Sequence, residues 1–283
     1  MSFQQHSPQH FRVLPPVVKN ILIINVIFFL ATLALGKSMN IDLVKILGLH
    51  YFGASAFEPY QIITYMFMHG GFTHILFNMF AVWMFGNALE HVWGGKRFLI
   101  YYLVTGVGAA ICHYLIMYFV DLAPSLQTIN QFLANPNPDS FNAFVNSSQD
   151  SIVPDKLRDY LKNFLSQYNQ LISTDPDMAL QNAVDFMVHY KREFLNAPVM
   201  IGASGAVFGI LLAFGMLFPN SLIYIYFAFP IKAKWFVIIY GALELYAGIT
   251  NEGSNVAHFA HLGGMVFGFF LIRLWHRKPK YFQ

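Results

Sequence analysis

Six long apolar runs constrain this chain more than any other feature of its sequence. A helix that crosses a bilayer needs about 17–25 mostly apolar residues, and only helices and closed barrels satisfy their backbone polar groups inside lipid. The candidate spans are 17–35, 72–89, 98–119, 199–218, 235–250 and 256–275. We therefore expect an all-α, polytopic membrane protein with a bundle of six transmembrane helices.

The composition supports a membrane protein. Hydrophobic residues make up 56% of the 283 residues and charged residues only 11%, whereas soluble domains carry about 25% charged residues. The net charge of +3 and the lack of basic runs with stacking aromatics argue against nucleic acid as a partner. The single cysteine, Cys112, cannot form an internal disulfide, and we expect it to pack within a helix. The first apolar run is long enough to stay in the membrane instead of being cleaved as a signal peptide.

Basic residues fall mainly on one side of these spans. That side holds Arg12, Lys19, Lys96, Arg97, Lys232, Lys234, Arg273, Arg277, Lys278 and Lys280. The short loops of the other side hold only Lys37 and Lys45. The positive-inside rule then places both termini in the cytoplasm, and we expect a bacterial inner (plasma) membrane. Even-numbered spans begin at the outer face.

The chain divides into five predicted segments. Cytoplasmic tails occupy 1–16 and 276–283, spans one to three lie in 17–119, and spans four to six lie in 199–275. Between them, 120–198 is a polar stretch that we expect to form a helical insertion on the outer face. Amphipathic spacing predicts two helices in it, one starting near Pro154 and one at Asp175–Pro176.

The first outer loop, 37–71, is apolar but interrupted by Gly and Pro. We expect it to lie along the membrane interface, a depth that suits Tyr51, Tyr60 and Tyr65. Ser55 in its GASAF segment is followed by Glu58–Pro59 and no span, so we interpret it as a loop residue.

Polar groups recur at one depth in the three spans that begin at the outer face. Ser204 and His261 each lie about six residues into a span, and His74 and Asn78 lie about three and seven residues into another. At about 1.5 Å per residue, all four fall in the outer third of the bilayer. Polar groups at that depth are costly and generally face the bundle interior.

Their chemistry favours a nucleophilic site. A serine needs a base to take its proton, and a neutral histidine is suited to that role. The G-x-x-x-G runs 205–209 and 264–268 let two helices approach closely, which would bring Ser204 within reach of His261. His74 and Asn78, four residues apart, could then donate to a developing oxyanion, with help from the N–H of Ser204. Each group alone is as well explained by helix packing or interhelical hydrogen bonding; their coincidence favours a site.

The motifs that carry these residues resemble those of the rhomboid family of intramembrane serine proteases, bacterial type. The matching stretches are HGGFTHILFNMF (69–80), GNALEHVWGGKRF (86–98), GASGAVFG (202–209) and AHLGGMVFG (260–268). The resemblance implies a Ser-His dyad that hydrolyses a peptide bond in or near transmembrane segments of membrane-protein substrates. It implies no cofactor and no metal, and a dyad without a third, acidic member, which fits the lack of Asp or Glu near the start of these spans.

The resemblance also assigns roles to residues. Ser204 is implied as nucleophile, His261 as general base, and His74 and Asn78 as the oxyanion site. Phe208 stands where many bacterial members have a tyrosine that packs on the catalytic histidine. Glu90 matches a position that ties helix ends together.

Other residues near these motifs receive weaker expectations. His258 precedes His261 by nearly one turn, but only His261 is followed by glycines at the spacing of the family, so we favour His261 as the base. We expect His258, His69, Gly202 and Phe208 at the mouth of the site or around it. The family's Trp-Arg pair in the first loop is replaced by Tyr60–Gln61, and the environment of Glu244 in span five is left open.

Three alternatives compete with a serine protease. The first is a catalytically inactive relative that binds transmembrane clients. The second is a membrane metalloprotease, which the absence of H-E-x-x-H disfavours. The third is a small-solute transporter, which the lack of recurring Gly/Pro-broken helices in two halves disfavours.

Overall fold

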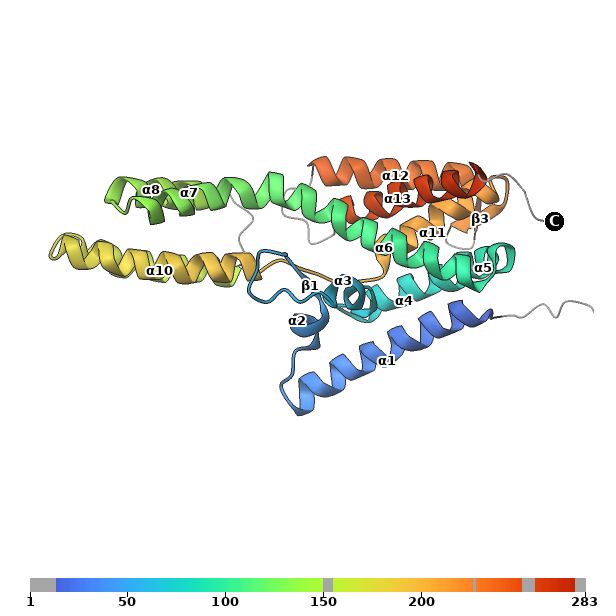
Figure 1. Cartoon of the computed structure of the whole chain (residues 1–283), viewed down its shortest axis with the longest axis horizontal. Helices are drawn as coiled ribbons and strands as arrows, with labels where there is room; N and C mark the ends of the chain where they lie inside the picture. The colour runs from blue at the N-terminus through green and yellow to red at the C-terminus, as the bar shows by residue number, and fades with distance from the viewer. Residues whose placement is uncertain (1–13, 150–154, 226–227, 251–257, 278–283) are drawn as a thin grey trace, which may run out of the picture.

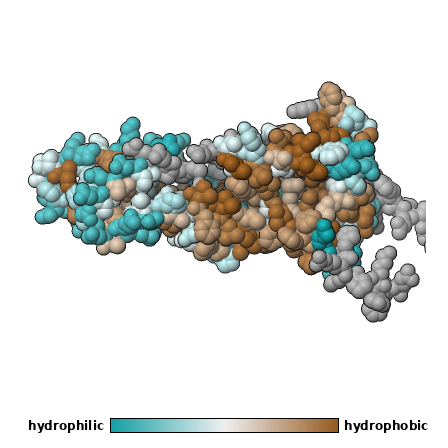
Figure 2. Space-filling model, turned by 90° about the horizontal axis from the view of Figure 1, so that it is seen from above, coloured by the Kyte–Doolittle hydropathy of each residue, from teal (hydrophilic) through white to brown (hydrophobic). Residues whose placement is uncertain are grey.

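The computed structural model describes residues 14–149, 155–225, 228–250 and 258–277, and most of them are helical. Figure 1 shows an elongated molecule in which the apolar helices gather at one end and α7, α8 and α10 extend from the other. Hydropathy divides along the same axis, with hydrophobic residues over the bundle and hydrophilic residues over the extension (Figure 2).

Four helices in the described part of the chain are long and apolar enough to cross a membrane: Pro16–Ser38, Phe72–Trp93, Gly95–Val120 and His258–Trp275. They match the first, second, third and sixth predicted spans. Their elements are α1 (Pro16–Ser38), α4 (Phe72–Ala81), the π-helical η2 (Val82–Gly86), α5 (Asn87–Trp93), α6 (Gly95–Met117), the π-helical η3 (Tyr118–Leu122) and α13 (His258–Arg277). The fifth predicted span corresponds to α12 (Ala233–Thr250).

The fourth predicted span begins later than expected. Its helix, α11, runs only from Ser204 to Leu217, or 14 residues, because Val199–Met200 forms a short strand, β2, and Gly202 adopts a φ of +115° that a helix cannot contain. The prediction of a helix from residue 199 is therefore wrong, and Ser204 is the first residue of the helix instead of the sixth. A hairpin of β3 (Leu222–Ile225) and β4 (Phe229–Lys232) connects α11 to α12.

Helix α11 is largely buried, and it packs against both α6 and α13, which also pack against each other. A Cβ added at Gly264 would lie 1.9 Å from the carbonyl oxygen of Gly205, so the backbones of α11 and α13 touch at this point. The predicted close approach of these helices is confirmed for this pair of glycines. Gly209, in contrast, faces Thr105 of α6, and Gly268 faces Tyr101 of the same helix, so α6 is a third partner that the sequence did not predict.

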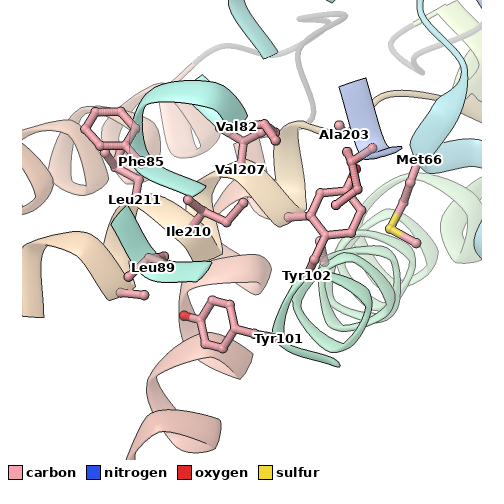
Figure 3. Packing of buried hydrophobic residues seen from close by; sticks show 14 of the residues in the cluster. Met66, Val82, Phe85, Leu89, Tyr101, Tyr102, Ala203, Val207, Ile210 and Leu211 are labelled. Carbon is pink, nitrogen blue, oxygen red and sulfur yellow. The ribbon is translucent and has the colours of Figure 1, made fainter. Parts of the chain in front are cut away.

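Large buried side chains from α6, η2, α5 and α11 pack together in the bundle (Figure 3). Tyr101 and Tyr102 of α6 are fully buried, and the Tyr101 hydroxyl donates to the carbonyl oxygen of Gly209 at 2.8 Å. Val207, Ile210 and Leu211 of α11 pack in the same cluster. Because lipid is as apolar as these side chains, close packing and such hydrogen bonds must hold the helices together.

In its described residues, the polar stretch between α6 and β2 contains the helices α7 (Ala123–Ala134), α8 (Pro138–Gln149), α9 (Asp155–Leu171) and α10 (Pro176–Asn196). The two predicted helices are confirmed as α9 and α10, and Asp175 caps α10 by accepting from the N–H of Met178 at 3.0 Å. These helices enclose a second hydrophobic cluster, with Phe132, Phe141, Phe144 and Met187 at its centre.

Helices α7 and α8 were missed by the sequence analysis. The sequence of α8, PDSFNAFVNSSQ, is rich in residues with weak helix propensity. It folds because Asn137 and Ser140 cap each other's backbone N–H groups and because Phe141 and Phe144 are buried against the neighbouring helices. Tertiary packing therefore overrides local propensity.

The first loop is organised by one buried amide, that of Gln61, which is 1% exposed. Its oxygen accepts from the N–H groups of His50 and Glu58, and its nitrogen donates to the carbonyls of Ile46 and Ala56, all at 3.0–3.3 Å. Every hydrogen-bonding group of this amide is used. Gln61 thus supplies an anchor where the Trp-Arg pair is absent.

This loop is joined directly to the segment that precedes α11. It contains α2 (Leu43–Leu47), β1 (Leu49–His50), α3 (Gln61–Thr64) and the 3₁₀ turn η1 (Tyr65–Phe67), and β1 pairs antiparallel with β2. Of the three tyrosines expected at the interface, Tyr51 and Tyr65 are instead buried, since Tyr65 donates to the carbonyl of Gly106 at 2.7 Å and Tyr51 stacks on Tyr118. Only Tyr60 is exposed.

The carboxylate of Glu90 in α5 binds the N-terminal backbone of α1, as the family resemblance implied. Its two carboxylate oxygens accept from the N–H groups of Val17 and Val18 at 3.0 and 2.7 Å. These N–H groups have no partner within their own helix, and the negative charge favours the helix N-terminus. Glu90 is 4% exposed, so the carboxylate depends on these bonds.

We predict that Glu90→Ala lowers the free energy of unfolding by about 1–3 kcal/mol, because it leaves two buried donors unpaired. Thermal unfolding of the purified protein in detergent measures the effect. Asp177→Asn is the matched control, since Asp177 also lies in the first turn of a helix but is exposed. Equal stability of the Glu90 and Asp177 variants would contradict this role.

Candidate active site

Ser204 stands at the first position of the central helix. The chain enters α11 through Gly202, whose N–H donates to the carbonyl of Tyr65 at 2.9 Å and so ties this entrance to the first loop. The first N–H groups of a helix have no intrahelical partner, so those at the start of α11 are available to an anion beside Ser204. Among the described residues, Ser204 Oγ makes no hydrogen bond of its own. It is a partly buried hydroxyl next to free backbone donors.

His261 lies against the same face of α11. The ring of Phe208 stacks on its imidazole, with centroids 4.2 Å apart and planes 5° from parallel. Ser204 and Phe208 are four residues apart and therefore share one face of α11. The Gly205–Gly264 contact brings the two backbones together at the same level. Ser204 and His261 therefore both lie close to the Gly205–Gly264 contact, and no hydrogen bond joins them in the described part of the chain.

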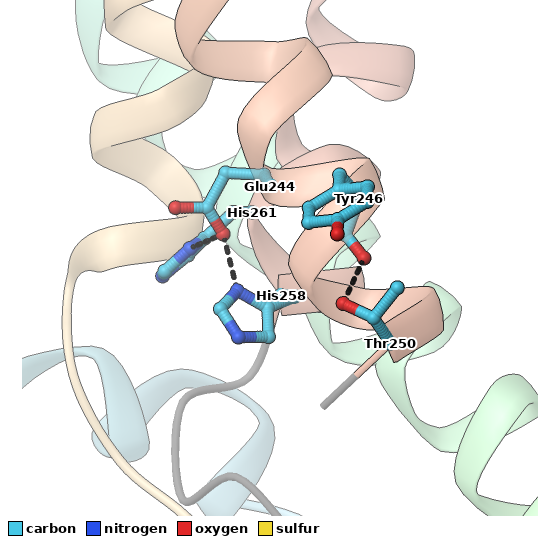
Figure 4. Close-up of polar contacts among 5 residues, drawn as sticks. All are labelled: Glu244, Tyr246, Thr250, His258 and His261. Atoms are coloured by element: carbon cyan, nitrogen blue, oxygen red, sulfur yellow. Dashed lines mark hydrogen bonds and ion pairs between the residues drawn. The ribbon is translucent and has the colours of Figure 1, made fainter. Parts of the chain in front are cut away.

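His261 has an acidic partner that the sequence did not predict. Glu244 of α12 is 7% exposed, and its Oε2 lies 2.8 Å from Nδ1 of His261 and 2.8 Å from Nδ1 of His258 (Figure 4). The expectation of no acid at these histidines is corrected, because the carboxylate comes from the middle of span five and not from the start of an outward-starting span. The available signal was Glu244 itself, since a carboxylate within an apolar helix needs a buried partner.

The bond to Glu244 decides which nitrogen of His261 can act as a base. A carboxylate only accepts, so Nδ1 carries the proton and Nε2 keeps its lone pair. The imidazole is held at its edge by Glu244 and on its face by Phe208. In the neutral form of this ring the lone pair is therefore on Nε2.

In His74 the proton lies on the other ring nitrogen. The N–H of Gly70 approaches its Nδ1 at 3.5 Å, which makes Nδ1 the acceptor and leaves Nε2 with the proton. A Cβ added at Gly202 would lie 2.7 Å from Nε2 of His74 and 3.8 Å from Oγ of Ser204. The Nε2–H donor of His74 therefore points toward the space around Ser204.

Asn78 and His69 complete the surroundings of His74. Asn78 lies one turn further along α4 and is 6% exposed, inside the bundle. His69 packs edge-on against His74, with centroids 4.9 Å apart. Burial, with a smaller contribution from His74, lowers the pKa of His69 to about 4, so this ring is neutral at pH 7. It can orient His74 without adding charge to the site.

The other predicted site residues lie around Ser204 and the two histidines. Gly202 lies between His74 and Ser204, whereas Phe208 and His258 surround His261. Ser55 lies in the first loop and bonds to Asn196, away from α11. Glu244, His258 and His261 each offer one ligand atom within 4.8 Å of the others, so this group could also hold a metal ion.

These positions suit acyl transfer. A hydroxyl lies beside a histidine with a free Nε2 lone pair, and a second histidine with a protonated Nε2 lies on the other side with the N–H groups of a helix start. A nucleophile, a base and electrophilic donors around one point are the parts that attack on a carbonyl requires.

The sequence model of the Rhomboid domain matches residues 56–124 and 178–278. The chain is 33% identical over 107 residues to the putative rhomboid protease YdcA of Bacillus subtilis, an alignment that covers 38% of this chain and 53% of that protein. It is 35% identical over 57 residues to the rhomboid protease GluP of the same organism, an alignment that covers 20% of this chain and 11% of that protein.

A third relative matches over a longer stretch. The uncharacterized rhomboid protein P4H10.10, mitochondrial, of Schizosaccharomyces pombe is 24% identical over 245 residues, which cover 81% of this chain and 56% of that protein. The chain therefore spans about half the length of two of these relatives and about a tenth of the third.

We predict that Gly202→Ala lowers the free energy of unfolding by about 1–3 kcal/mol, because φ is +115° and the new Cβ would clash with the ring of His74. Thermal unfolding in detergent tests this. Gly71→Ala is the control, because Gly71 lies on the other side of His74 in extended backbone with open space around its Cβ position. A similar loss in both variants would contradict the prediction.

Proposed function

This chain belongs to the rhomboid family of integral membrane proteins, and we propose that it is an active intramembrane serine endopeptidase. Its proposed reaction is hydrolysis of a peptide bond in or near a transmembrane segment of a membrane-protein substrate. The observation that carries the proposal is the convergence of Ser204, His261 and His74, from three separate helices, at the entrance to α11.

In the proposed mechanism, Ser204 Oγ attacks the substrate carbonyl while Nε2 of His261 takes the hydroxyl proton. The new C–O bond forms as the carbonyl oxygen becomes an oxyanion. Nε2–H of His74, the Asn78 amide and the N–H of Ser204 donate to that oxyanion. His261 then returns the proton to the leaving amine as the C–N bond breaks. A water molecule, deprotonated by His261, releases the acyl group and restores Ser204.

We propose six spanning segments, with α11 and α12 as the fourth and fifth. Helix α11 would be about 21 Å long, which is shorter than the hydrocarbon core, and its burial inside the bundle supports a position away from lipid. Both termini lie in the cytoplasm in this proposal, and the site opens to the outer face of a bacterial plasma membrane. The basic residues and the two Bacillus relatives support this orientation and location.

The segments 17–119 and 199–275 form the membrane core in this proposal. Residues 120–198 form an insertion on the outer face, and the hydrophilic surface over α7–α10 supports its place outside the bilayer (Figure 2). The gap from 125 to 177 in the family match agrees with an added segment. Because the insertion joins β2 directly before Ser204, it would stand at the mouth where substrates arrive.

A substrate helix hides its carbonyls in its own hydrogen bonds and must unwind before attack. We propose that it enters beside α12 and the loop Ile249–Val256, most of which lies outside the described residues. Transmembrane proteins and the lipid bilayer are the proposed partners, with no nucleic acid, cofactor or metal needed.

We predict that the purified protein cleaves a single-span substrate in liposomes and that Ser204→Ala abolishes cleavage. His74→Ala and Asn78→Ala should each lower kcat by up to about 10²–10³-fold, the usual cost of losing an oxyanion donor. Ser55→Ala is the matched control, since it removes a serine hydroxyl from a similar short motif in the loop, and it should cleave normally.

Other outcomes would identify the alternatives. Cleavage that persists in Ser204→Ala would exclude the serine mechanism. No cleavage of several substrates, together with no labelling of Ser204 by a fluorophosphonate, would instead indicate a catalytically inactive rhomboid-like protein that binds transmembrane clients.

A further inference from the structure

We propose that Glu244 is a positioning residue for His261, so that this chain uses a Ser204–His261–Glu244 triad in place of a dyad. This inference rests on the proposed peptidase function and concerns how the base of that site is oriented. The observation that carries it is one buried carboxylate oxygen that both His261 and His258 approach at 2.8 Å.

The burial of the three groups makes this contact significant. The side chains of Glu244, His258 and His261 are only 9–12% exposed. A carboxylate in such a place is costly unless it is hydrogen-bonded, and two N–H donors on one oxygen meet that need. Both imidazoles are thereby fixed with the proton on Nδ1.

The consequence for catalysis lies at the opposite nitrogen. With Nδ1–H held by Glu244, Nε2 of His261 is unprotonated and ready to accept the proton of Ser204. When the proton arrives, the imidazolium forms next to a carboxylate, which stabilises the positive charge. Glu244 stays ionised throughout, and the proton travels only between Ser204, His261 and the leaving amine.

His258 supports the carboxylate from the other side. It begins α13 and lies one turn before His261, and its ring stands nearly perpendicular to that of His261. Its bond to the same Oε2 restricts the rotation of the Glu244 side chain (Figure 4). A carboxylate held from two sides can in turn hold His261 in one orientation.

A purely structural tie between α12 and α13 is the competing explanation. These helices have other close contacts: a Cβ added at Gly241 would lie 3.2 Å from Met265, and one at Gly248 would lie 3.2 Å from His258 Cβ and 3.3 Å from Phe259. Apolar packing therefore joins the helices without the carboxylate. The distinguishing property is the orientation of His261, which affects kcat and not substrate binding.

The test compares Glu244→Gln with wild type in the liposome cleavage assay. Glutamine keeps the volume but removes the charge, and we expect kcat to fall by about 10²-fold or more while KM stays within about twofold. His258→Gln leaves the His261–Glu244 bond in place, so it should lower kcat much less than Glu244→Gln. Thr32→Val is the matched control, because it removes a hydroxyl-to-carbonyl hydrogen bond within α1 that does not involve His261, and its kcat should equal that of wild type.

The results separate this inference from the proposed function. If wild type cleaves, Ser204→Ala does not, and Glu244→Gln keeps the wild-type kcat, the triad is overturned while the serine peptidase stands. If wild type does not cleave, the proposed function has failed first. If chelators abolish wild-type cleavage and Zn²⁺ restores it, the Glu244–His258–His261 group holds a metal and the hydrogen-bonding role is overturned.

A second measurement covers the case in which Glu244→Gln does not fold. Wild-type protein with ¹⁵N-labelled histidine is examined by NMR, and the His261 signals are identified by their loss in His261→Gln. We expect the Nδ1–H tautomer with its proton in a hydrogen bond. A His261 that carries its proton on Nε2 in the resting protein would overturn the inference.

Discussion

The contact between Gly205 and Gly264 is the constraint on which the rest of this structure depends. Inside a bilayer, burying apolar side chains gives helices little reason to associate, so they are held by close packing and by hydrogen bonds between polar groups. Glycine lets the backbones of α11 and α13 touch, and Ala109 of α6 packs against Gly205 at the same point. One residue before this contact on α11 is Ser204, and three residues before it on α13 is His261. A side chain at either glycine would separate the nucleophile from the base.

Around that contact, the two histidines are held in place by neighbouring groups. Gly70 sets the tautomer of His74, Glu244 sets that of His261, and Phe208 fixes the plane of the His261 ring. The two histidines consequently present opposite properties toward Ser204, a donor on one side and an acceptor on the other. Polar groups at this depth are costly, and their mutual bonds reduce that cost while setting their chemistry.

The parts outside the bundle are coupled to the same entrance. The first loop holds its shape through Gln61, pairs with β2 through β1, and accepts the N–H of Gly202 at the Tyr65 carbonyl. The four-helix extension has its own hydrophobic cluster and ends at β2. Both segments therefore meet where the chain enters α11. A structural change in either segment can thus be transmitted to Ser204 through only a few residues.

The sequence by itself determined the four long apolar helices that match the first, second, third and sixth predicted spans, the starts of α9 and α10, and the glycine contact between α11 and α13. These features follow from local periodicity, capping residues and small-residue spacing, which are properties of nearby positions in the chain. Only the tertiary structure decided that α11 begins at Ser204, because pairing of β2 with the distant β1 and the positive φ of Gly202 end the preceding segment. Likewise, only the tertiary structure decided that α8 is a helix, that Tyr51 and Tyr65 are buried, and that Glu244 reaches His261. Each of these features depends on contacts between residues far apart in the sequence. The periodicity of one segment does not indicate which side chains of another helix will pack against it.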